Sequence, residues 1–519
     1  MKKYILLSIL LILTIPSVLA LFHPGFFLSD DGEWMIIRFS AFHQALRDGQ
    51  FPVRFLTRLN YGYGYPVANF LYPGFMYLAE IFKLLGFGFV NSIKIILGLS
   101  MISSAVFCYF WLSKLFKTVP ALCGALFYLY APYHLYDAYT RGSVGEVLAL
   151  AIVPFVLWQV ERKSVFWSSL GIGLLILSHN TLAVLFLPFI FLYFCLDIWI
   201  ARANIKERND LLKRYITTLL AGLGLSAFFW IPALFDLQYT IFSSTPVSDF
   251  SNYFANIKLI GFSTLSIFLV TLIFIFSKRI DIDKNRLTVL FFVVGFISLF
   301  FSGAFSAPFW NVLPVSFVQF PLRLLSVVIV SASFLLASVM AVSSKQIQIV
   351  LLSVIGLFII ISFKQYGTPI QFFDKGESFY ATNEGTTTVK NEYMPVWVKN
   401  VPYAHPENII EGAPEGISNV QTNSNKVDFN FVSTLGGNVT INRVYFPGWN
   451  TYVNNVQVST GVEATGGGQM KVVLPKDNSM VSLEFGETPM RLFADVVSLT
   501  SFFILGVIAY NYKRKRQHV

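Results

Sequence analysis

The sequence predicts an all-α polytopic membrane bundle of about twelve spanning helices, with a β-rich domain outside the membrane near the C-terminus. The chain has 519 residues, of which 55% are hydrophobic and only 13% are charged. Because a soluble domain carries about 25% charged residues, this deficit indicates that most of the surface faces lipid. Aromatic residues reach 17%, as expected for Phe in contact with lipid and for belts of Tyr and Trp at the membrane interface.

The spans are apolar runs long enough to cross roughly 30 Å of hydrocarbon. The first run follows Lys2 and Lys3 and could pass for a cleavable signal peptide, but we expect an uncleaved helix. The predicted spans are residues 4–22, 89–112, 119–136, 145–160, 164–179, 181–200, 215–233, 258–277, 287–303, 321–342, 347–364 and 491–511.

Basic loops orient these spans. If the N-terminus is cytoplasmic, every short inside loop carries Lys or Arg, as the positive-inside rule requires. These loops account for the net charge of +10, and they form no clustered basic face of the kind that binds nucleic acid. We therefore expect a protein of the cell membrane with both termini in the cytoplasm.

One apolar segment is not counted as a span. Counting residues 70–86 would place Lys114, Lys117, Arg162 and Lys163 outside. We predict a re-entrant or interfacial helix on the outer face instead.

Two hydrophilic regions then lie outside, residues 23–88 and 365–490. The second has short alternating runs separated by Gly- and Asn-rich turns, which are typical of β-hairpins. The predicted organisation is a transmembrane domain over 1–364, a β-sandwich-like domain over 365–490, and a last helix with a basic tail over 491–519. The three cysteines all lie in apolar stretches, so the outer domain has no disulfide.

An acid pair, Asp30 and Asp31, directly follows the first span. One interpretation is a solvated cap on a helix predicted over 33–48, with Ser29 or Asp30 at its N-cap. The other is a general base held at the membrane surface, which could deprotonate an acceptor hydroxyl. The apolar stripe of the helix that follows predicts that it lies flat on the membrane surface.

Further polar residues stand near the ends of the predicted spans. Arg141 and Glu146 form a candidate anion site, since a guanidinium can grip a phosphate with two hydrogen bonds, and a salt-bridged turn is the alternative. Arg323 opens a span and is expected to face the protein interior. The other candidates are Arg54, Tyr63 and Tyr65 in the first outer loop, His179 between two spans, and Glu392 at the start of the outer domain.

Several short motifs resemble known membrane proteins. The layout of one span, an acid pair, a surface helix and a Gly/aromatic loop is similar to the GT-C superfamily of membrane glycosyltransferases. Tyr72-Pro-Gly-Phe-Met76 and Thr140-Arg-Gly-Ser-Val-Gly-Glu146 resemble stretches of oligosaccharyltransferase catalytic subunits, and Phe446-Pro-Gly-Trp449 resembles the outer domain of a related family.

A closer resemblance is to bacterial membrane proteins called 6-pyruvoyl-tetrahydropterin synthase-related. The motifs that carry it are Asp30-Asp31, Tyr63-Gly-Tyr-Pro66, Arg141-Gly-Ser-Val-Gly-Glu146, Gln319-Phe-Pro-Leu-Arg323 and Glu392-Tyr-Met-Pro395. The sequence shows neither pterin chemistry nor a zinc-binding His cluster.

The GT-C resemblance implies a polyprenyl-phosphate or polyprenyl-diphosphate sugar donor and a cell-envelope glycan, lipid or protein as acceptor. It puts the catalytic base at Asp30 or Asp31, with Asp31 favoured, and the phosphate contacts at Arg141, Arg323 or Arg54. No cofactor is certain. Asp30 and Asp31 could chelate Mg²⁺ or Mn²⁺, or a single base could act without a metal.

Two other functions remain open at this stage. A transporter or flippase of lipid-linked glycans would be expected to show inverted repeats, which the sequence lacks. A non-catalytic scaffold in envelope assembly would keep the β domain but would not need the acids.

Overall fold

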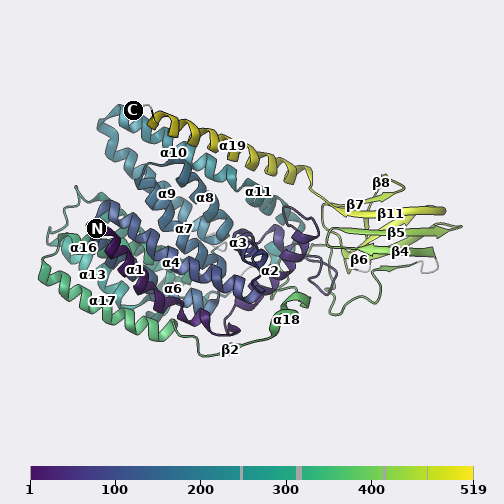
Figure 1. Cartoon of the computed structure of the whole chain (residues 1–519), viewed down its shortest axis with the longest axis horizontal. Helices are drawn as coiled ribbons and strands as arrows, with labels where there is room; N and C mark the ends of the chain where they lie inside the picture. The colour runs from purple at the N-terminus through teal and green to yellow at the C-terminus, as the bar shows by residue number, and fades with distance from the viewer. Residues whose placement is uncertain are drawn as a thin grey trace.

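The computed structural model describes residues 2–245, 249–310, 312, 318–412, 416–464 and 466–517. A helical bundle fills one end of the molecule and a β domain projects from the other (Figure 1). Both predicted parts of the fold, a polytopic helical bundle and a C-proximal β-rich domain, are therefore present. The helices are α1 Lys2–Val18, α2 Gly32–Arg47, α3 Gly74–Leu84, α4 Phe89–Leu115, α5 Thr118–Tyr130, α6 Pro132–Tyr136, α7 Val144–Glu161, α8 Val165–Ser178, α9 Asn180–Ile200, α10 Ile205–Leu225, α11 Ala227–Asp236, α12 Ile257–Ile260, α13 Phe262–Phe276, α14 Arg286–Ser302, α15 Ala307–Trp310, α16 Leu325–Val342, α17 Lys345–Tyr366, α18 Gly376–Thr382 and α19 Pro489–Gln517.

Fewer than twelve helices in the described residues are long and apolar enough to count as membrane crossings. Seven helices in the described residues are long and apolar enough to cross a membrane, and up to ten cross if each of three bent pairs counts as one span. Two of the remaining predicted spans, α5 and α8, have only 13 and 14 residues, whereas a crossing takes about 20. The count of twelve therefore stays a prediction.

Residues 70–86 do not form a crossing, as predicted. Only α3 is helical there, and its 11 residues extend about 16 Å, roughly half the thickness of the hydrocarbon. It lies beside α2, at the end of the bundle that faces the β domain (Figure 1).

The predicted position of α2 on the membrane surface rested on an apolar stripe that faces lipid, and the structure shows this stripe covered by protein instead. The stripe, which includes Ile36, Phe39 and Phe42, is fully buried. The neighbours that cover it are α3, α4 and the short helix α18, which belongs to the second outer region. Because α18 is more than 300 residues away in the sequence, the helical periodicity alone could not distinguish protein cover from lipid.

The β domain contains two sheets with alternating inward residues. One has the strand order β3-β6-β10-β9 and the other β4-β5-β11-β7-β8. Inward residues such as Phe429, Phe431, Ile441 and Val472 are buried, as in a sandwich core. The strands are β3 Ile410–Glu411, β4 Ile417–Thr422, β5 Lys426–Ser433, β6 Gly437–Val444, β7 Trp449–Val453, β8 Val456–Val458, β9 Gly461–Val462, β10 Gln469–Leu474 and β11 Asp477–Phe485.

A buried ion pair joins the β domain to the bundle. Arg491, at the start of α19, donates to Asp236 Oδ2 at the end of α11 over 2.9 Å, and Asn69 donates to the same oxygen over 2.9 Å. The Phe446-Pro-Gly-Trp449 motif packs here, with the Phe446 ring 5.2 Å from the Arg491 guanidinium carbon. Gly448 has a φ of +119°, and a Cβ there would lie 2.8 Å from Arg491 Nη1, so this turn requires glycine.

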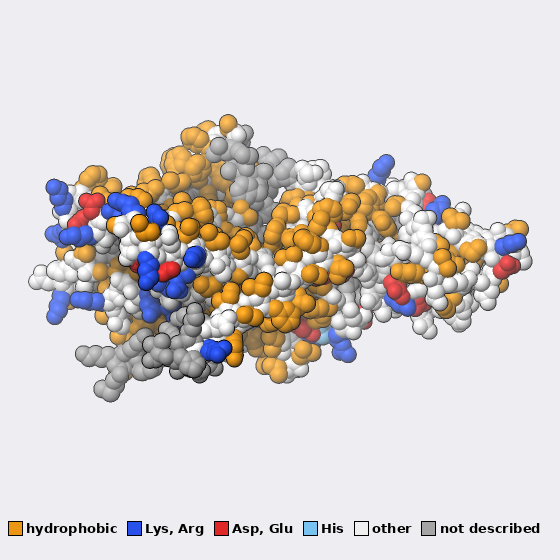
Figure 2. Space-filling view, turned by 90° about the horizontal axis from the view of Figure 1, so that it is seen from above, with side chains coloured by type: hydrophobic (Ala, Val, Ile, Leu, Met, Phe, Trp, Pro, Cys, Tyr) orange, Lys and Arg blue, Asp and Glu red, His pale blue; other side chains and the backbone are white. Residues whose placement is uncertain are grey.

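Both ends of the chain lie at the end of the bundle opposite the β domain (Figure 1). Lys and Arg side chains gather at that same end (Figure 2). This polarity is the one on which the predicted topology depends.

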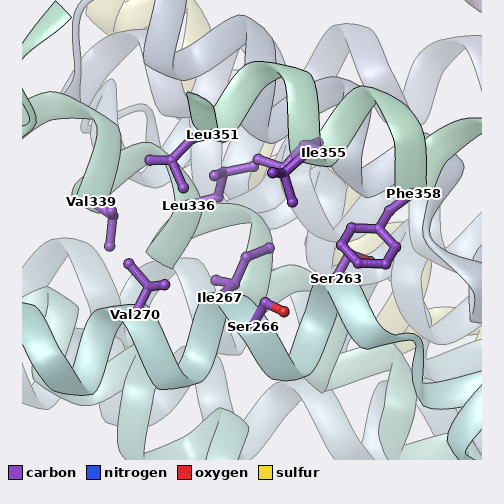
Figure 3. Close-up of a pocket in the computed structure, with 10 residues that line it drawn as sticks. Ser263, Ser266, Ile267, Val270, Leu336, Val339, Leu351, Ile355 and Phe358 are labelled. Carbon is purple, nitrogen blue, oxygen red and sulfur yellow. The ribbon is translucent and has the colours of Figure 1, made fainter. Parts of the chain in front are cut away.

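A small apolar pocket lies within the bundle, between α13, α16 and α17 (Figure 3). Its lining includes Ile267, Leu336 and Ile355. Leu336 lies about 20 Å along α16 from Arg323, so this pocket is separate from the polar residues described next.

Candidate functional site

The acid pair is held against the loop that carries Arg141. Asp30 N–H donates to Thr140 O over 3.0 Å, and Asp31 N–H donates to Arg141 O over 2.7 Å. Gly142 makes this contact possible, because a Cβ there would lie 2.9 Å from Gly32 N. These backbone bonds bring Asp31 Oδ2 within 3.8 Å of Arg141 Nη2.

A second backbone pairing holds the segment just before the acid pair. Strand β1, Phe26–Phe27, pairs antiparallel with β2, Phe372–Phe373. The segment that carries the acid pair is therefore bonded to two distant parts of the chain, the Arg141 loop and β2.

The predicted side-chain cap on the following helix is absent. Asp31, not Ser29 or Asp30, is the N-cap residue of α2, and its carboxylate accepts no capping hydrogen bond. The Asp31 side chain is 42% exposed, so it is available to a ligand. Burial, and next the Asp31 carboxylate, raise the pKa of Asp30 above its ordinary value.

Arg141 and Arg323 converge on one carboxylate oxygen. Glu146 Oε1 lies 2.6 Å from Arg141 Nη1 and 2.8 Å from Arg323 Nε. Glu146 is fully buried, and its Oε2 accepts from Tyr133 OH over 3.1 Å. Glu146 therefore fixes the distance between the two guanidinium groups, and its burial leaves no exposed face for the predicted direct contact with a substrate.

Asp137 adds a second carboxylate to this cluster. Its Oδ1 lies 2.8 Å from Arg141 Nη1, while its buried Oδ2 has no hydrogen-bond partner in the described part of the chain. Burial raises the pKa of Asp137 well above its ordinary value, and Glu146 adds to this shift.

His179 is a buried neighbour of the cluster. Its Nδ1 accepts from Leu182 N–H over 3.3 Å, so Nε2 carries the proton that points to Glu146 Oε1, 3.5 Å away. With Nδ1 accepting and Nε2 donating, the ring of His179 holds a single proton and is neutral. Its ring packs on Tyr72 at 4.5 Å, so a neutral, structural imidazole is indicated at neutral pH.

Arg323 is buried, as expected for a cation at this depth. Its Nη1 donates to Gln319 Oε1 over 2.6 Å, and its guanidinium carbon lies 4.7 Å from the Phe320 ring. The Arg141 guanidinium carbon lies 5.8 Å from the same ring. The Gln319-Phe-Pro-Leu-Arg323 motif thus places one arginine beside the other.

Sequence reasoning missed Arg38. This residue lies on α2, and its Nε donates to Thr387 Oγ1 over 3.0 Å, while its Nη2 donates to Thr387 O. Burial raises the pKa of Glu392, whereas Arg38 opposes this shift and Asp31 adds to it. The charges of Arg38 and Asp31 therefore both act on Glu392. The sequence signal that could have pointed to Arg38 was a basic residue beside the apolar face of a predicted helix.

Tyr65 joins the outer loop to residues 384–396, whereas Tyr63 joins it to the β domain. Tyr65 is fully buried, and its hydroxyl lies 2.9 Å from Thr388 Oγ1 and accepts from Tyr393 N–H over 3.0 Å. Tyr63 O accepts from Val444 N–H of the β domain over 2.7 Å. Tyr65 therefore has no exposed face for direct contact with a substrate.

Arg54 belongs to a different cluster. Its Nε lies 2.9 Å from Glu487 Oε1, its Nη2 lies 3.1 Å from Asp495 Oδ1, and its Nη1 donates to Phe228 O over 2.9 Å. Arg54 thus anchors the start of α19, and the structure does not bring it to Arg141 or Arg323. The prediction that Arg54 contacts the phosphate is therefore not supported by its position.

The residues present do not by themselves fit a metal ion. In the described ranges, no three His, Cys, Asp or Glu side chains are placed to hold one. Asp30 and Asp31 offer two carboxylates, whereas Mg²⁺ prefers near-octahedral coordination by six oxygens. A divalent cation here would need further oxygens from a ligand or water, and we derive no chemical step through one.

A family model for the "6-pyruvoyl-tetrahydropterin synthase related domain; membrane protein" matches residues 71–368. The chain belongs to this family. The match includes Arg141, Glu146 and Arg323, but not Asp30, Asp31 or most of the β domain.

This chain is also similar in sequence to a protein of Lactococcus lactis subsp. cremoris strain MG1363 that is described as uncharacterized. It is 28% identical over 312 residues, which cover 53% of this chain and 50% of that protein. The chain thus spans about half the length of this relative.

Solved structures of two membrane enzymes are also similar. The oligosaccharyltransferase of Archaeoglobus fulgidus tethered with an acceptor peptide gives a TM-score of 0.46 at 12% identity, covering 78% of this chain and 61% of that one. ArnT from Cupriavidus metallidurans bound to undecaprenyl phosphate gives a TM-score of 0.39 at 14% identity, covering 73% and 68%.

Proposed function

We propose that this protein transfers a sugar from a polyprenyl-phosphate or polyprenyl-diphosphate carrier to a cell-envelope acceptor outside the cytoplasm. The observation that carries the proposal is the contact between an accessible carboxylate, Asp31, and the buried Arg141, which Glu146 holds beside Arg323. Such a transfer needs a base for the acceptor and positive charge for the departing phosphate, and nothing more is required of the protein.

Asp31 is assigned as the base. It accepts the proton of the acceptor hydroxyl while that oxygen attacks the anomeric carbon of the donor. The bond between the anomeric carbon and the phosphate oxygen breaks, and its electron pair leaves with the phosphate. Attack from the face opposite the leaving phosphate inverts the anomeric centre.

Arg141 and Arg323 are assigned to the phosphate. Both guanidinium groups are already ordered by hydrogen bonds, so little reorganisation is needed as negative charge develops on the phosphate.

The orientation is part of this proposal. The acid pair, α3 and the β domain lie at the end of the bundle opposite the basic side chains (Figures 1 and 2). By the positive-inside rule, the basic end is cytoplasmic and the site opens outside, where lipid-linked sugars of the outer leaflet are within reach.

The test is an assay of the purified full-length protein against a panel of polyprenyl-phosphate and polyprenyl-diphosphate sugars. We expect turnover with at least one donor and its loss in Asp31→Asn. Glu33→Gln is the matched control, because Glu33 lies on the same helix but pairs with Lys375 over 2.6 Å. Donor movement across proteoliposomes without any covalent transfer would instead indicate a flippase.

A further inference from the structure

A second group of charges lies at the basic end of the bundle, around Trp199 near the end of α9. The guanidinium carbon of Arg202 lies 4.1 Å from the Trp199 ring centre. The guanidinium carbon of Arg286, the first residue of α14, lies 4.2 Å from the same ring. Two cations from separate segments of the chain thus converge on one indole, which is 47% exposed.

Neither arginine forms an ion pair with a carboxylate in the described parts of the chain. Acids on adjacent turns have other partners: Asp281 pairs with Lys284 over 3.5 Å, and Asp197 accepts from Tyr215. Two guanidinium groups close together repel each other, and the ring offsets this repulsion only in part. An anion at this position is therefore attracted by two positive charges that no carboxylate of the described residues neutralises.

The position of the group indicates which anion is within reach. Trp199 and Arg286 mark the ends of two apolar helices at the same end of the bundle, and exposed Trp at such ends lies at the level of lipid headgroups. Lys and Arg side chains surround this end (Figure 2). A phosphate at this level belongs to a phospholipid, and a guanidinium binds it with two parallel hydrogen bonds.

We propose that Trp199, Arg202 and Arg286 form a binding site for the phosphate headgroup of an anionic phospholipid at the basic end of the bundle. The indole holds the guanidinium carbons of Arg202 and Arg286 at 4.1 and 4.2 Å from its ring centre, and the headgroup contacts both cations. This distinguishes a built site from the diffuse attraction that any basic membrane protein has for anionic lipid. The proposal is independent of the transferase function, because no residue of the acid and arginine cluster takes part.

The experiment measures lipid binding to the full-length protein in a neutral detergent. Short-chain phosphatidylglycerol is titrated, and the bound lipid is counted by native mass spectrometry. We expect saturable binding, weakened about fivefold by Arg202→Gln or by Arg286→Gln. Trp199→Leu leaves the net charge unchanged, and we expect it to weaken binding as well, since it removes the ring that holds the two cations together.

Lys284→Gln is the charge-matched control, because its ammonium is already paired with Asp281. It should bind phosphatidylglycerol like the parent, and phosphatidylcholine should bind equally weakly to every variant. The proposal is overturned if Lys284→Gln weakens binding as much as Arg202→Gln, or if Trp199→Leu binds like the parent. It is also overturned if inorganic phosphate at the same concentration competes fully, since the ligand would then be free phosphate and not a lipid.

Discussion

Asp31 is the residue whose replacement tests the chemistry most directly. Asp31→Asn keeps the shape of the side chain and removes its basicity. A general base contributes about 10²–10⁴ in rate, so turnover should fall by that order while the protein still inserts and folds. Steady-state kinetics of purified Asp31→Asn measure this fall, with Glu33→Gln near the parent rate. Full activity in Asp31→Asn, Asp30→Asn and the double variant would mean that neither acid is the base.

Asp30 should behave differently, because the structure gives it no capping role. The folded protein raises the pKa of Asp30 above its ordinary value of 3.8, so its ionised form is disfavoured in the fold. At pH values well above 3.8, where Asp30 is ionised, its charge therefore destabilises the fold. This destabilisation fades as the pH falls and the carboxyl is protonated. Thermal unfolding of Asp30→Asn should show a stability at pH 7 no lower than the parent's, with the difference shrinking toward pH 4. A less stable Asn variant at pH 7 would contradict this assignment.

Arg141→Ala and Arg323→Ala should each weaken donor binding. A charge-assisted hydrogen bond is worth roughly 1.5–3 kcal/mol, which corresponds to about 10- to 150-fold in affinity. Lys replacements should recover only part, because the two-pronged geometry is lost. Each Ala variant also leaves Glu146 with one cation fewer, so binding is compared only among variants that elute as folded protein. Parent-like donor affinity in both Ala variants would show that neither arginine contacts phosphate.

At this scale the sequence predicts the residue types of the site better than their roles. The short spacing between Arg141 and Glu146 indicated a shared site, and the position of Arg323 at the start of a span indicated a buried side chain, but neither indicated that the three residues meet. The role of Glu146 was not predictable, because its partners Arg323 and Tyr133 come from separate helices. Arg38 was missed because its partner Thr387 lies 349 residues away.

Among the elements, the topology of the helices carries the first prediction. We expect a cysteine introduced at Ser459, between β8 and β9, to react with an impermeant maleimide from outside intact cells. A cysteine at Lys117, between α4 and α5, should react only after the membrane is opened. Both are made in a background without Cys108, Cys123 and Cys195. Labelling of the Lys117→Cys variant in intact cells would reverse the orientation of the whole bundle.

The second prediction at this scale concerns the junction between α11 and α19. Arg491 and Asp236 are both fully buried, so Arg491→Met leaves an uncompensated carboxylate, which costs roughly 3–5 kcal/mol. We expect a large fall in the unfolding midpoint of the purified protein. Adding Asp236→Asn should restore part of it, since the buried charge is then gone. If the double variant were no more stable than Arg491→Met, the ion pair would not be the reason for the loss.

Apolar periodicity was sufficient to locate the elements but not their surroundings. The bends of 66° between α10 and α11 and 80° after α14 divide apolar runs that look continuous in sequence. The apolar stripe of α2 has the same period whether lipid or protein covers it. Only the fold shows that α18 is the cover.

For the whole molecule, the bundle alone should not make a complete site. A chain ending at Tyr366 keeps α1 to α17 but loses β2, Thr387 and Thr388, the partners of β1, Arg38 and Tyr65. We expect it to insert into the membrane, to show no transferase activity, and to be cleaved by added protease within residues 23–31. Protection of that loop equal to the full chain would show that the bundle holds it alone.

The pairing of β1 with β2 also determines when, during synthesis of the chain, the site can assemble. The ribosome makes Phe27 early, but its partner Phe372 only after most of the chain has been inserted. Until then, the acid pair of the nascent protein is without the backbone partner of β1. A chain whose translation stops early would thus remain in the membrane as a helical bundle without an assembled centre, and transfer would start only once synthesis is nearly finished.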